Sequence, residues 1–328
     1  MANSIMGNPI FGVNVIVAVG SVDGMAGAAA CIRHSKNSNI QLIFTQAFQV
    51  NLVDVSKWPP GSSVGFIDLG VNNEGQTPNQ QLTVDFVKRI YESGHKILFI
   101  ADEHGKNSWK DLLENCGHDK RELSIRPKDR GDKYGSSCAI LLKALEESAD
   151  THTKALLRDG HQGDQMNFDT PFGRIFNNGI KSNMSDPTRR PYMVQYMAQH
   201  ESPDAKIQGW MNEYAEMESN LPKILESRQD LGNGIFLYDG TIGRHDATAI
   251  FRDAYKMSSI AVLSGTNVFI EGKMQVGISI ATSNKNLNVL EIIQKAGISA
   301  GGMPAKANFA LENAQAAINA VRSAAEHL

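Results

Sequence analysis

Short apolar runs alternate with helix-like patterns through the first half of the chain. Apolar residues recur at helical spacing over Asn79–Ser93, and Gly94 follows as a C-terminal cap signal. A further helix is predicted over Ser136–Glu147. Strands that alternate with helices are typical of a parallel sheet covered by helices. The predicted strands are Val13–Val19, Ile40–Thr45, Ser63–Leu69, Lys96–Ala101 and, as a fifth, Glu122–Arg126.

The pattern changes near Pro187, where the chain becomes polar and is interrupted by prolines, with helical stretches between them. Beyond Gly234 strands return, and two predicted helices, Asn288–Ala296 and Asn308–Glu326, flank a glycine turn. The strands predicted here are Gly234–Tyr238, Ser259–Leu263, Val268–Glu271 and Met274–Thr282. We therefore predict an α/β fold in three parts: a domain with a parallel sheet over residues 1–186, a helical connector over 187–232 and a smaller α/β domain over 233–328.

Composition and charge limit the classes of function. The chain has 328 residues, of which 41% are hydrophobic and 20% charged, and its net charge is −3. This is ordinary for a globular protein and gives no general attraction to nucleic acids or membranes. Neither a signal peptide nor an apolar run of membrane-spanning length is recognised, so a cytoplasmic protein without a membrane partner is expected. No basic stripe accompanies the aromatic residues, so long DNA is not an expected partner.

Acidic residues follow three of the predicted strands. Asp23 follows the first strand, Asp68 lies at the end of the third, and Asp102-Glu103-His104 follows the fourth. Sites in parallel sheets form at the carboxyl ends of the strands, so these side chains are expected to converge. A further acidic segment, "RDGHQGDQMNFD", contains Asp159 and Asp164. Carboxylates with imidazole suit Mg²⁺ or Mn²⁺, and such an ion would assist the hydrolysis of a phosphate ester.

The order of these motifs resembles the DHH phosphoesterase superfamily with its DHH-associated C-terminal domain. That superfamily includes nanoRNA and cyclic-dinucleotide phosphodiesterases, RecJ-type exonucleases, family II pyrophosphatases and exopolyphosphatases. The similarity covers nearly the whole chain and rests on five segments: "SVDGMAGAAACI", "FIDLG", "ADEHG" in place of Asp-His-His, "GSSCAILLKAL", and "ISAGGMPAKANFAL" in place of the glycine-rich substrate loop.

Three positions depart from the family pattern. Ser21 stands where the first motif has its first aspartate, Glu103 replaces the middle histidine, and Met303 replaces the histidine of the C-terminal loop. The resemblance implies one retained metal site, formed by Asp23, Asp68, Glu103 and an acid of the 159–169 segment. Asp159 is favoured there and Asp164 is the alternative. The family's second ion would have little beyond Asp68, so the number of Mn²⁺ or Mg²⁺ ions, one or two, stays open.

The remaining site predictions follow partly from the resemblance and partly from the chemistry of the residues. His104 matches the histidine that faces the substrate phosphate, and it is the candidate catalytic residue, as a general acid or hydrogen-bond donor. Asp102 is either a further metal ligand or a residue that orients the turn. In the C-terminal domain, the expected contacts to the substrate come from Ser283, Asn284, Gly301, Gly302 and Lys306.

The leading expectation is a metal-dependent phosphoesterase that hydrolyses a small nucleotide, such as a short oligoribonucleotide or a cyclic nucleotide, in a cleft between the two domains. The main alternative is a nucleotide-binding or scaffolding protein that has kept the fold and lost the chemistry, and the changes at Ser21, Glu103 and Met303 favour it. A pyrophosphatase or exopolyphosphatase is the second alternative. Whether the chain forms a homodimer stays open.

Overall fold

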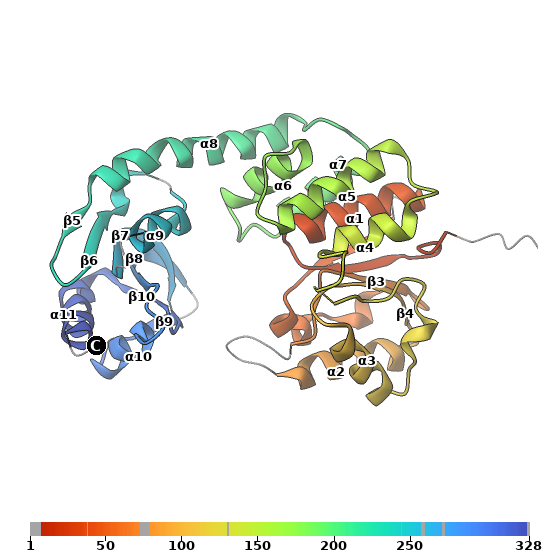
Figure 1. The fold of residues 1–328 in the computed structure, drawn as a ribbon, viewed down its shortest axis with the longest axis horizontal. Helices are drawn as coiled ribbons and strands as arrows, with labels where there is room; N and C mark the ends of the chain where they lie inside the picture. The colour runs from red at the N-terminus through yellow and green to blue at the C-terminus, as the bar shows by residue number, and fades with distance from the viewer. Residues whose placement is uncertain are drawn as a thin grey trace, which may run out of the picture. The chain divides into compact units, whose positions relative to one another are not determined.

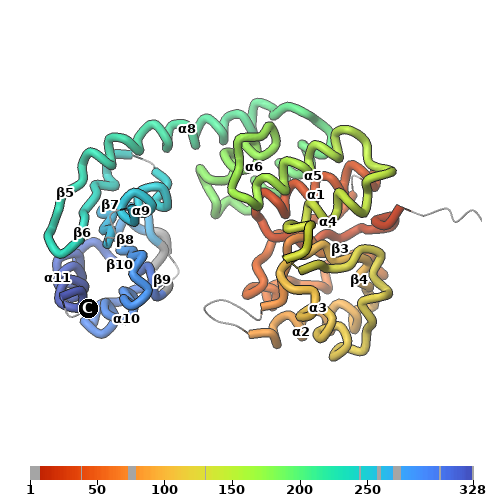
Figure 2. The backbone as a smooth tube through the Cα atoms, viewed as in Figure 1, coloured from red at the N-terminus to blue at the C-terminus, as the bar shows by residue number. Residues whose placement is uncertain are grey.

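The first 211 residues are organised around a sheet of four parallel strands (Figures 1 and 2). In this computed structural model, residues 8–326 are described, apart from 38, 73–78, 130, 244, 257–259 and 271–272. The chain forms two compact units, Met1–Met211 and Asn212–Leu328. The predicted α/β class is confirmed, and the finer division with a separate connector over 187–232 stays a prediction.

The sheet of the first unit has the order β2-β1-β3-β4. The strands are β1 (Val15–Ala18), β2 (Gln41–Phe44), β3 (Ser63–Ile67) and β4 (Lys96–Ala101). Three of them coincide with continuous apolar runs because both faces of a parallel sheet are covered by helices. After β1 the chain adds β2 on one side of it and β3 on the other. The strand order therefore reverses at β1, and ligands bind at such a switch point in open α/β sheets.

Helices cover both faces of this sheet (Figure 1). Five lie on one face and share a core built on the alanine-rich α1, and two lie on the other and pack around Phe66, Phe86 and Trp109. The first group is α1 (Val22–Ser35), α4 (Ser137–Leu145), α5 (Thr151–Asp164), α6 (Pro171–Lys181) and α7 (Arg189–Met197). The second group is α2 (Gln80–Glu92) and α3 (Lys106–Asn115), and short 3₁₀ turns occur at η1 (Ala47–Leu52), η2 (Val55–Lys57) and η3 (Lys120–Glu122).

The prediction of a fifth strand over Glu122–Arg126 is wrong. Glu122 ends the 3₁₀ turn η3, and the next residues run beside β4 without forming a regular strand. Ser124 N donates to Leu98 O, but Ile100 N donates to Ile125 O, one residue further than a regular parallel ladder requires. Pro127 then interrupts the segment because it has no N–H to donate. The buried side chains of Leu123 and Ile125 account for the strand-like pattern.

The second unit contains a mixed sheet of six strands in the order β5-β6-β7-β8-β10-β9. α10 and α11 pack on one face of it and α9 on the other. The strands are β5 (Gln229–Asp230), β6 (Ile235–Asp239), β7 (Ile260–Ile270), β8 (Lys273–Thr282), β9 (Ala300–Met303) and β10 (Lys306–Ala310). The helices are α8 (Ala205–Glu226), which begins in the first unit, α9 (Ala247–Tyr255), α10 (Val289–Lys295) and α11 (Ala314–Ala325), with 3₁₀ turns η4 (Gly240–Ile242) and η5 (Leu311–Asn313). Among the described residues, the structure contains no helix with the length and apolar character of a membrane span.

Two predictions for this unit are corrected. Two of the strands predicted separately are one, β7, whose pairing with β8 shifts between Ser264 and Thr266. The intervening Gly265 has a φ of +73°, so this bulge breaks the alternation that a continuous strand would show. Ser259 and Glu271, at the outer ends of those two predictions, lie outside the described residues.

The second correction concerns the helix predicted over Asn308–Glu326, which begins only at Ala314. Ala307 and Phe309 are buried on one face of β10 while Asn308 lies between them, a period of two that indicates a strand. Gly301 and Gly302 therefore do not join two helices but form β9, which pairs antiparallel with β10. A side chain at Gly302 would begin 2.1 Å from Lys306 O, so the hairpin requires glycine there.

Candidate metal centre

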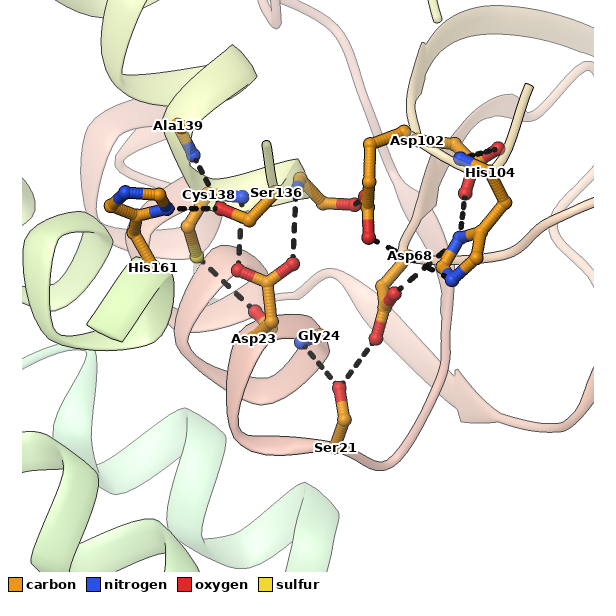
Figure 3. Close-up of polar contacts among 12 residues, drawn as sticks. Ser21, Asp23, Gly24, Asp68, Asp102, His104, Ser136, Cys138, Ala139 and His161 are labelled. Atoms are coloured by element: carbon orange, nitrogen blue, oxygen red, sulfur yellow. Dashed lines mark hydrogen bonds and ion pairs between the residues drawn. The ribbon is translucent and has the colours of Figure 1, made fainter. Parts of the chain in front are cut away.

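Asp68 stands directly after β3, at the switch point of the sheet. It adopts a left-handed backbone conformation with a φ of +58°, which aspartate tolerates better than most residues. One carboxylate oxygen, Oδ2, accepts a hydrogen bond of 2.5 Å from the Ser21 hydroxyl, and the other lies 3.9 Å from Nδ1 of His104 (Figure 3). Burial, followed by the charges of Asp23 and Glu103, raises the pKa of Asp68 well above its ordinary value.

Three residues follow β4: Asp102, which contacts the ring of His104, and Glu103 and His104, whose side chains lie near Asp68. Asp102 is fully buried and lies between His104 and Trp109: Oδ1 is 2.7 Å from His104 Nδ1, and Oδ2 accepts from Trp109 Nε1 at 2.9 Å. The hydrogen bond that Asp102 accepts from the imidazole raises the pKa of His104 to about 9. With Nδ1 engaged, Nε2 of His104 is left 3.7 Å from Glu103 Oε1. Asp102 therefore orients the imidazole ring.

Glu103 is fully buried and is also positioned by a serine. Its Oε2 accepts a hydrogen bond of 2.8 Å from the hydroxyl of Ser137, the first residue of α4. Two hydroxyls thus fix the two acids, Ser21 at Asp68 and Ser137 at Glu103. The sequence motifs predict no such role for either serine, although Ser21 occupies an aspartate position of the first motif. The serine pair at the start of the helix predicted from Ser136 was the available signal for Ser137, but only the fold shows which carboxylate it contacts.

Asp68, Glu103 and His104 each place one ligand atom within 4.8 Å of the others. Two carboxylates and an imidazole match the hard and borderline donors that Mn²⁺ and Mg²⁺ accept. The imidazole has the hydrogen-bonded arrangement of metal-binding histidines, which usually direct their second ring nitrogen to a carboxylate or carbonyl. The donor set present therefore fits one divalent ion.

Asp23, predicted as a metal ligand, has both carboxylate oxygens engaged by backbone groups, and its role as a ligand stays a prediction. Its Oδ2 accepts from Ser137 N at 2.9 Å and its Oδ1 from Cys138 N at 3.0 Å, so both oxygens receive backbone N–H groups at the start of α4 (Figure 3). A carboxylate at this end of a helix compensates the unpaired N–H groups and the helix dipole. Burial nevertheless raises the pKa of Asp23 to about 7. Asp23 therefore joins α1 to α4 beside the cluster.

The structure separates the two acids left open in the 159–169 segment. Asp159 accepts a hydrogen bond of 2.8 Å from Phe172 N at the start of α6. Asp164, at the end of α5, lines a cavity of about 390 Å³ together with Asp68 and His104. Asp164 is thus the acid of this segment that the fold brings toward the cluster.

The residues predicted to contact substrate in the second unit lie on or beside β8, β9 and β10. Lys306 Nζ lies 5.0 Å from the ring centroid of Phe251, and burial lowers the pKa of this lysine. Asn284 Oδ1 accepts from Asn286 N in the turn after β8, next to the exposed Ser283. Gly301 and Gly302 are paired within the sheet. Their role in substrate binding stays a prediction.

Comparisons with known proteins reveal relatives in structure only. No protein-family model matches the sequence, and no curated protein matches it either. Among solved structures, the pGpG-specific phosphodiesterase PggH from Vibrio cholerae is similar over 95% of this chain and 99% of its own, with a TM-score of 0.57 and 12% identity. The exonuclease RecJ bound to manganese is similar over 96% of this chain and 90% of its own, with a TM-score of 0.53 and 12% identity.

These similarities define the fold class: an α/β architecture with a helix-covered parallel sheet and a second sheet unit. It is the fold of these two proteins, and it agrees with the fold that the resemblance of the motifs implies.

Proposed function

We propose that this protein is a metal-dependent phosphoesterase that acts on a small nucleotide and uses a single divalent ion. The observation that carries the proposal is the convergence of Asp68, Glu103 and His104 within 4.8 Å at the carboxyl end of the parallel sheet. Two proteins of similar fold support it, since one is a phosphodiesterase and the other a manganese-bound exonuclease. The same fold occurs with many different functions, so the main support for this function is the cluster of Asp68, Glu103 and His104.

The three side chains would hold one Mn²⁺ or Mg²⁺. Such an ion polarises a phosphoryl oxygen and lowers the pKa of a bound water. The protein's own contribution is positioning: Ser21 and Ser137 each bind one oxygen of an acid, and Asp102 fixes the ring of His104. Supporting hydrogen bonds of this kind orient metal ligands and typically change metal affinity 10- to 100-fold.

The test begins with protein treated with chelator and reloaded with Mn²⁺ or Mg²⁺. Turnover is then measured on dinucleotides, cyclic dinucleotides, a chromogenic phosphodiester and pyrophosphate. We expect hydrolysis of a small nucleotide that requires the metal and is lost in Asp68→Asn and Glu103→Gln. Asp159→Asn is the matched control, because it removes a charge from an acid outside the cluster. Equal loss in Asp159→Asn, or turnover that survives in Asp68→Asn, would contradict the proposed centre.

A second candidate is a nucleotide-binding or scaffolding protein without catalytic activity. It is favoured by the position of Ser21, which offers a hydroxyl in place of a carboxylate, and by Asp23, whose two oxygens both accept hydrogen bonds from α4. Nucleotide binding without turnover, and without retained metal in elemental analysis, would support it. Activity gained in a Ser21→Asp, Glu103→His double variant would then indicate lost rather than altered chemistry.

A further inference from the structure

The cavity beside the cluster has an exposed aromatic side chain in its wall. Phe48 lies in η1, directly after β2, and lines the same cavity of about 390 Å³ as Asp68 and His104. Its side chain is 55% exposed, whereas Phe66, Phe86 and Phe99 in the same unit are fully buried. Stacking a ligand on this phenyl ring would recover part of the free energy that its exposure to water forgoes.

The 3₁₀ turn that carries Phe48 is fixed by hydrogen bonds to α2. Arg89 of α2 donates to Val53 O at 2.9 Å and to Val50 O at 3.0 Å, and the side chain of Val50 is fully buried. The exposed ring therefore stands on an anchored turn. A surface fixed before the ligand arrives loses little conformational entropy on binding, and this favours a recognition role.

The other walls of the cavity are neutral around this ring. Val19 and Val71 are apolar, and the exposed Gln46 contributes a carboxamide, which can pair with the donor and acceptor edges of a base. Asn72 also lines the cavity, but it is buried and its Nδ2 donates to Asn79 O.

None of the described residues that line the cavity is lysine or arginine. The lining thus combines two acids, Asp68 and Asp164, with the aromatic ring of Phe48 and neutral residues. Its volume lies in the range of about 300–1,000 Å³ that small-molecule sites occupy.

We propose that Phe48 is a stacking platform for a nucleobase of the substrate, placed next to the phosphate that the metal centre would act on. This inference rests on the proposed function and narrows it: the substrate is a nucleotide with an unpaired base, and inorganic pyrophosphate and polyphosphate would not use this wall. Stacking of a base on an aromatic side chain tolerates different bases, because every base presents a π-face. Gln46 is the lining residue whose exposed carboxamide could discriminate among them.

The test compares the affinity for AMP with that for ribose 5-phosphate, which has the same phosphate and sugar but no base. Isothermal titration calorimetry is performed with Mn²⁺ and again in EDTA, on the wild type and three variants. We expect AMP to bind more tightly by roughly 5- to 150-fold, the range that base stacking supplies. Phe48→Ala should remove this preference and Phe48→Trp should retain it. Leu52→Ala is the matched control, since Leu52 lies in the same turn, is 74% exposed and does not line the cavity.

Each outcome separates this inference from the proposed function. Equal affinity for AMP and ribose 5-phosphate in the wild type, a preference that persists in Phe48→Ala, or an equal loss in Leu52→Ala would overturn the stacking role. Metal-dependent hydrolysis could still be observed in each of those cases. A base preference that depends on Phe48, in a protein without turnover, would support the stacking role and overturn the hydrolase.

Discussion

Ser21 Oγ donates a hydrogen bond of 2.5 Å to Asp68 Oδ2 and accepts one of 2.9 Å from Gly24 N. A single hydroxyl thus caps the first turn of α1 and holds the carboxylate that stands at the end of β3. The two residues are 47 positions apart in the chain. A substitution at Ser21 is therefore expected to change both the stability of the fold and the binding of a metal ion at Asp68.

Ser21→Ala should lower the free energy of unfolding and weaken the binding of Mn²⁺. Loss of the cap should cost about 1 kcal/mol, within the usual range for an N-cap serine. Loss of the hydrogen bond to Asp68 should weaken Mn²⁺ binding by about 10-fold, the lower end of the effect of such supporting residues. Chemical denaturation of the metal-free protein and calorimetric titration with Mn²⁺ measure the two effects separately.

Asn288→Ala provides the control for the capping effect. Asn288 caps α10 in the other unit by accepting from Glu291 N, and it touches none of the cluster residues in the described contacts. It should lose a similar amount of stability with unchanged affinity for Mn²⁺. If Ser21→Ala binds Mn²⁺ as tightly as Asn288→Ala does, then the hydrogen bond from Ser21 to Asp68 does not contribute to metal binding.

His104→Gln distinguishes a metal ligand from a proton donor. Because Asp102 engages Nδ1 and leaves Nε2 beside Glu103, we expect the substitution to weaken Mn²⁺ binding at least 10-fold. A histidine that only protonated the leaving group would leave the affinity for Mn²⁺ unchanged and would lower kcat by about 10²- to 10⁴-fold. His161→Gln is the matched control, since that imidazole is bonded to Ser136 and is not in the cluster. Unchanged Mn²⁺ affinity in His104→Gln would return His104 to the general-acid role.

Much of the fold and the place of the site follow from local patterns in the sequence. The apolar runs at β1, β3 and β4 predict buried strands, and the acids after them predict a convergent site, since the carboxyl ends of parallel strands meet at one edge. The hairpin of β9 and β10 was missed. Its alternation covers only five residues in β10 and runs almost directly into the alanine-rich α11.

The roles of individual acids could not be read from the sequence. Asp23 follows a strand as a ligand would, but a carboxylate in that place equally accepts N–H groups from a helix, and only the fold shows that α4 supplies such groups here. The same ambiguity applies to Asp159, which accepts from the start of α6. The contacts of Ser21 and Ser137 join residues 47 and 34 positions apart, so no local pattern encodes them.

The metal-free protein should lose stability as the pH rises from about 4 to about 7. Burial raises the pKa of Asp23 from 3.8 to about 7, so the folded state binds a proton that the unfolded state has released in this range. Deprotonation of Asp23 then costs on the order of 4 kcal/mol of unfolding free energy, complete above pH 7 and absent below pH 4. Asp23→Asn removes this titrating carboxyl but also replaces one acceptor oxygen with an NH2 group beside the N–H groups of α4, so its absolute stability need not match that of the wild type. The fall in stability between pH 4 and pH 7 should be smaller in this variant than in the wild type, as measured by denaturation in EDTA.

Asp150 should contribute to stability with the opposite dependence on pH, and Asp150→Asn tests this. Asp150 caps α5, and the hydrogen bonds from Thr153 and Arg33 help to hold its pKa below the ordinary value. Its stabilising contribution is therefore present above pH 4 and disappears as the pH falls through its folded pKa, so the substitution should destabilise the protein at pH 8. Parallel pH profiles for Asp23→Asn and the wild type would show that Asp23 is not the group responsible.

The packing of α1, α4 and α5 beside the cluster depends on a glycine. A side chain at Gly160 of α5 would begin 2.4 Å from Cys138 Sγ and 2.7 Å from Ala26 Cβ, closer than real contacts allow. Gly160→Ala should therefore lower the free energy of unfolding by about 1–3 kcal/mol, as overpacking of a core does. Gly209→Ala in α8 is the matched control: nothing lies within 4 Å of the added methyl, and alanine favours a helix by up to about 1 kcal/mol. Both substitutions gain the same helix propensity. A change in the free energy of unfolding that is negative for Gly160→Ala and positive for Gly209→Ala, measured by urea denaturation, therefore reports the packing around Gly160. A stabilised Gly160→Ala variant would mean that α5 can shift away from α1 and α4 without cost.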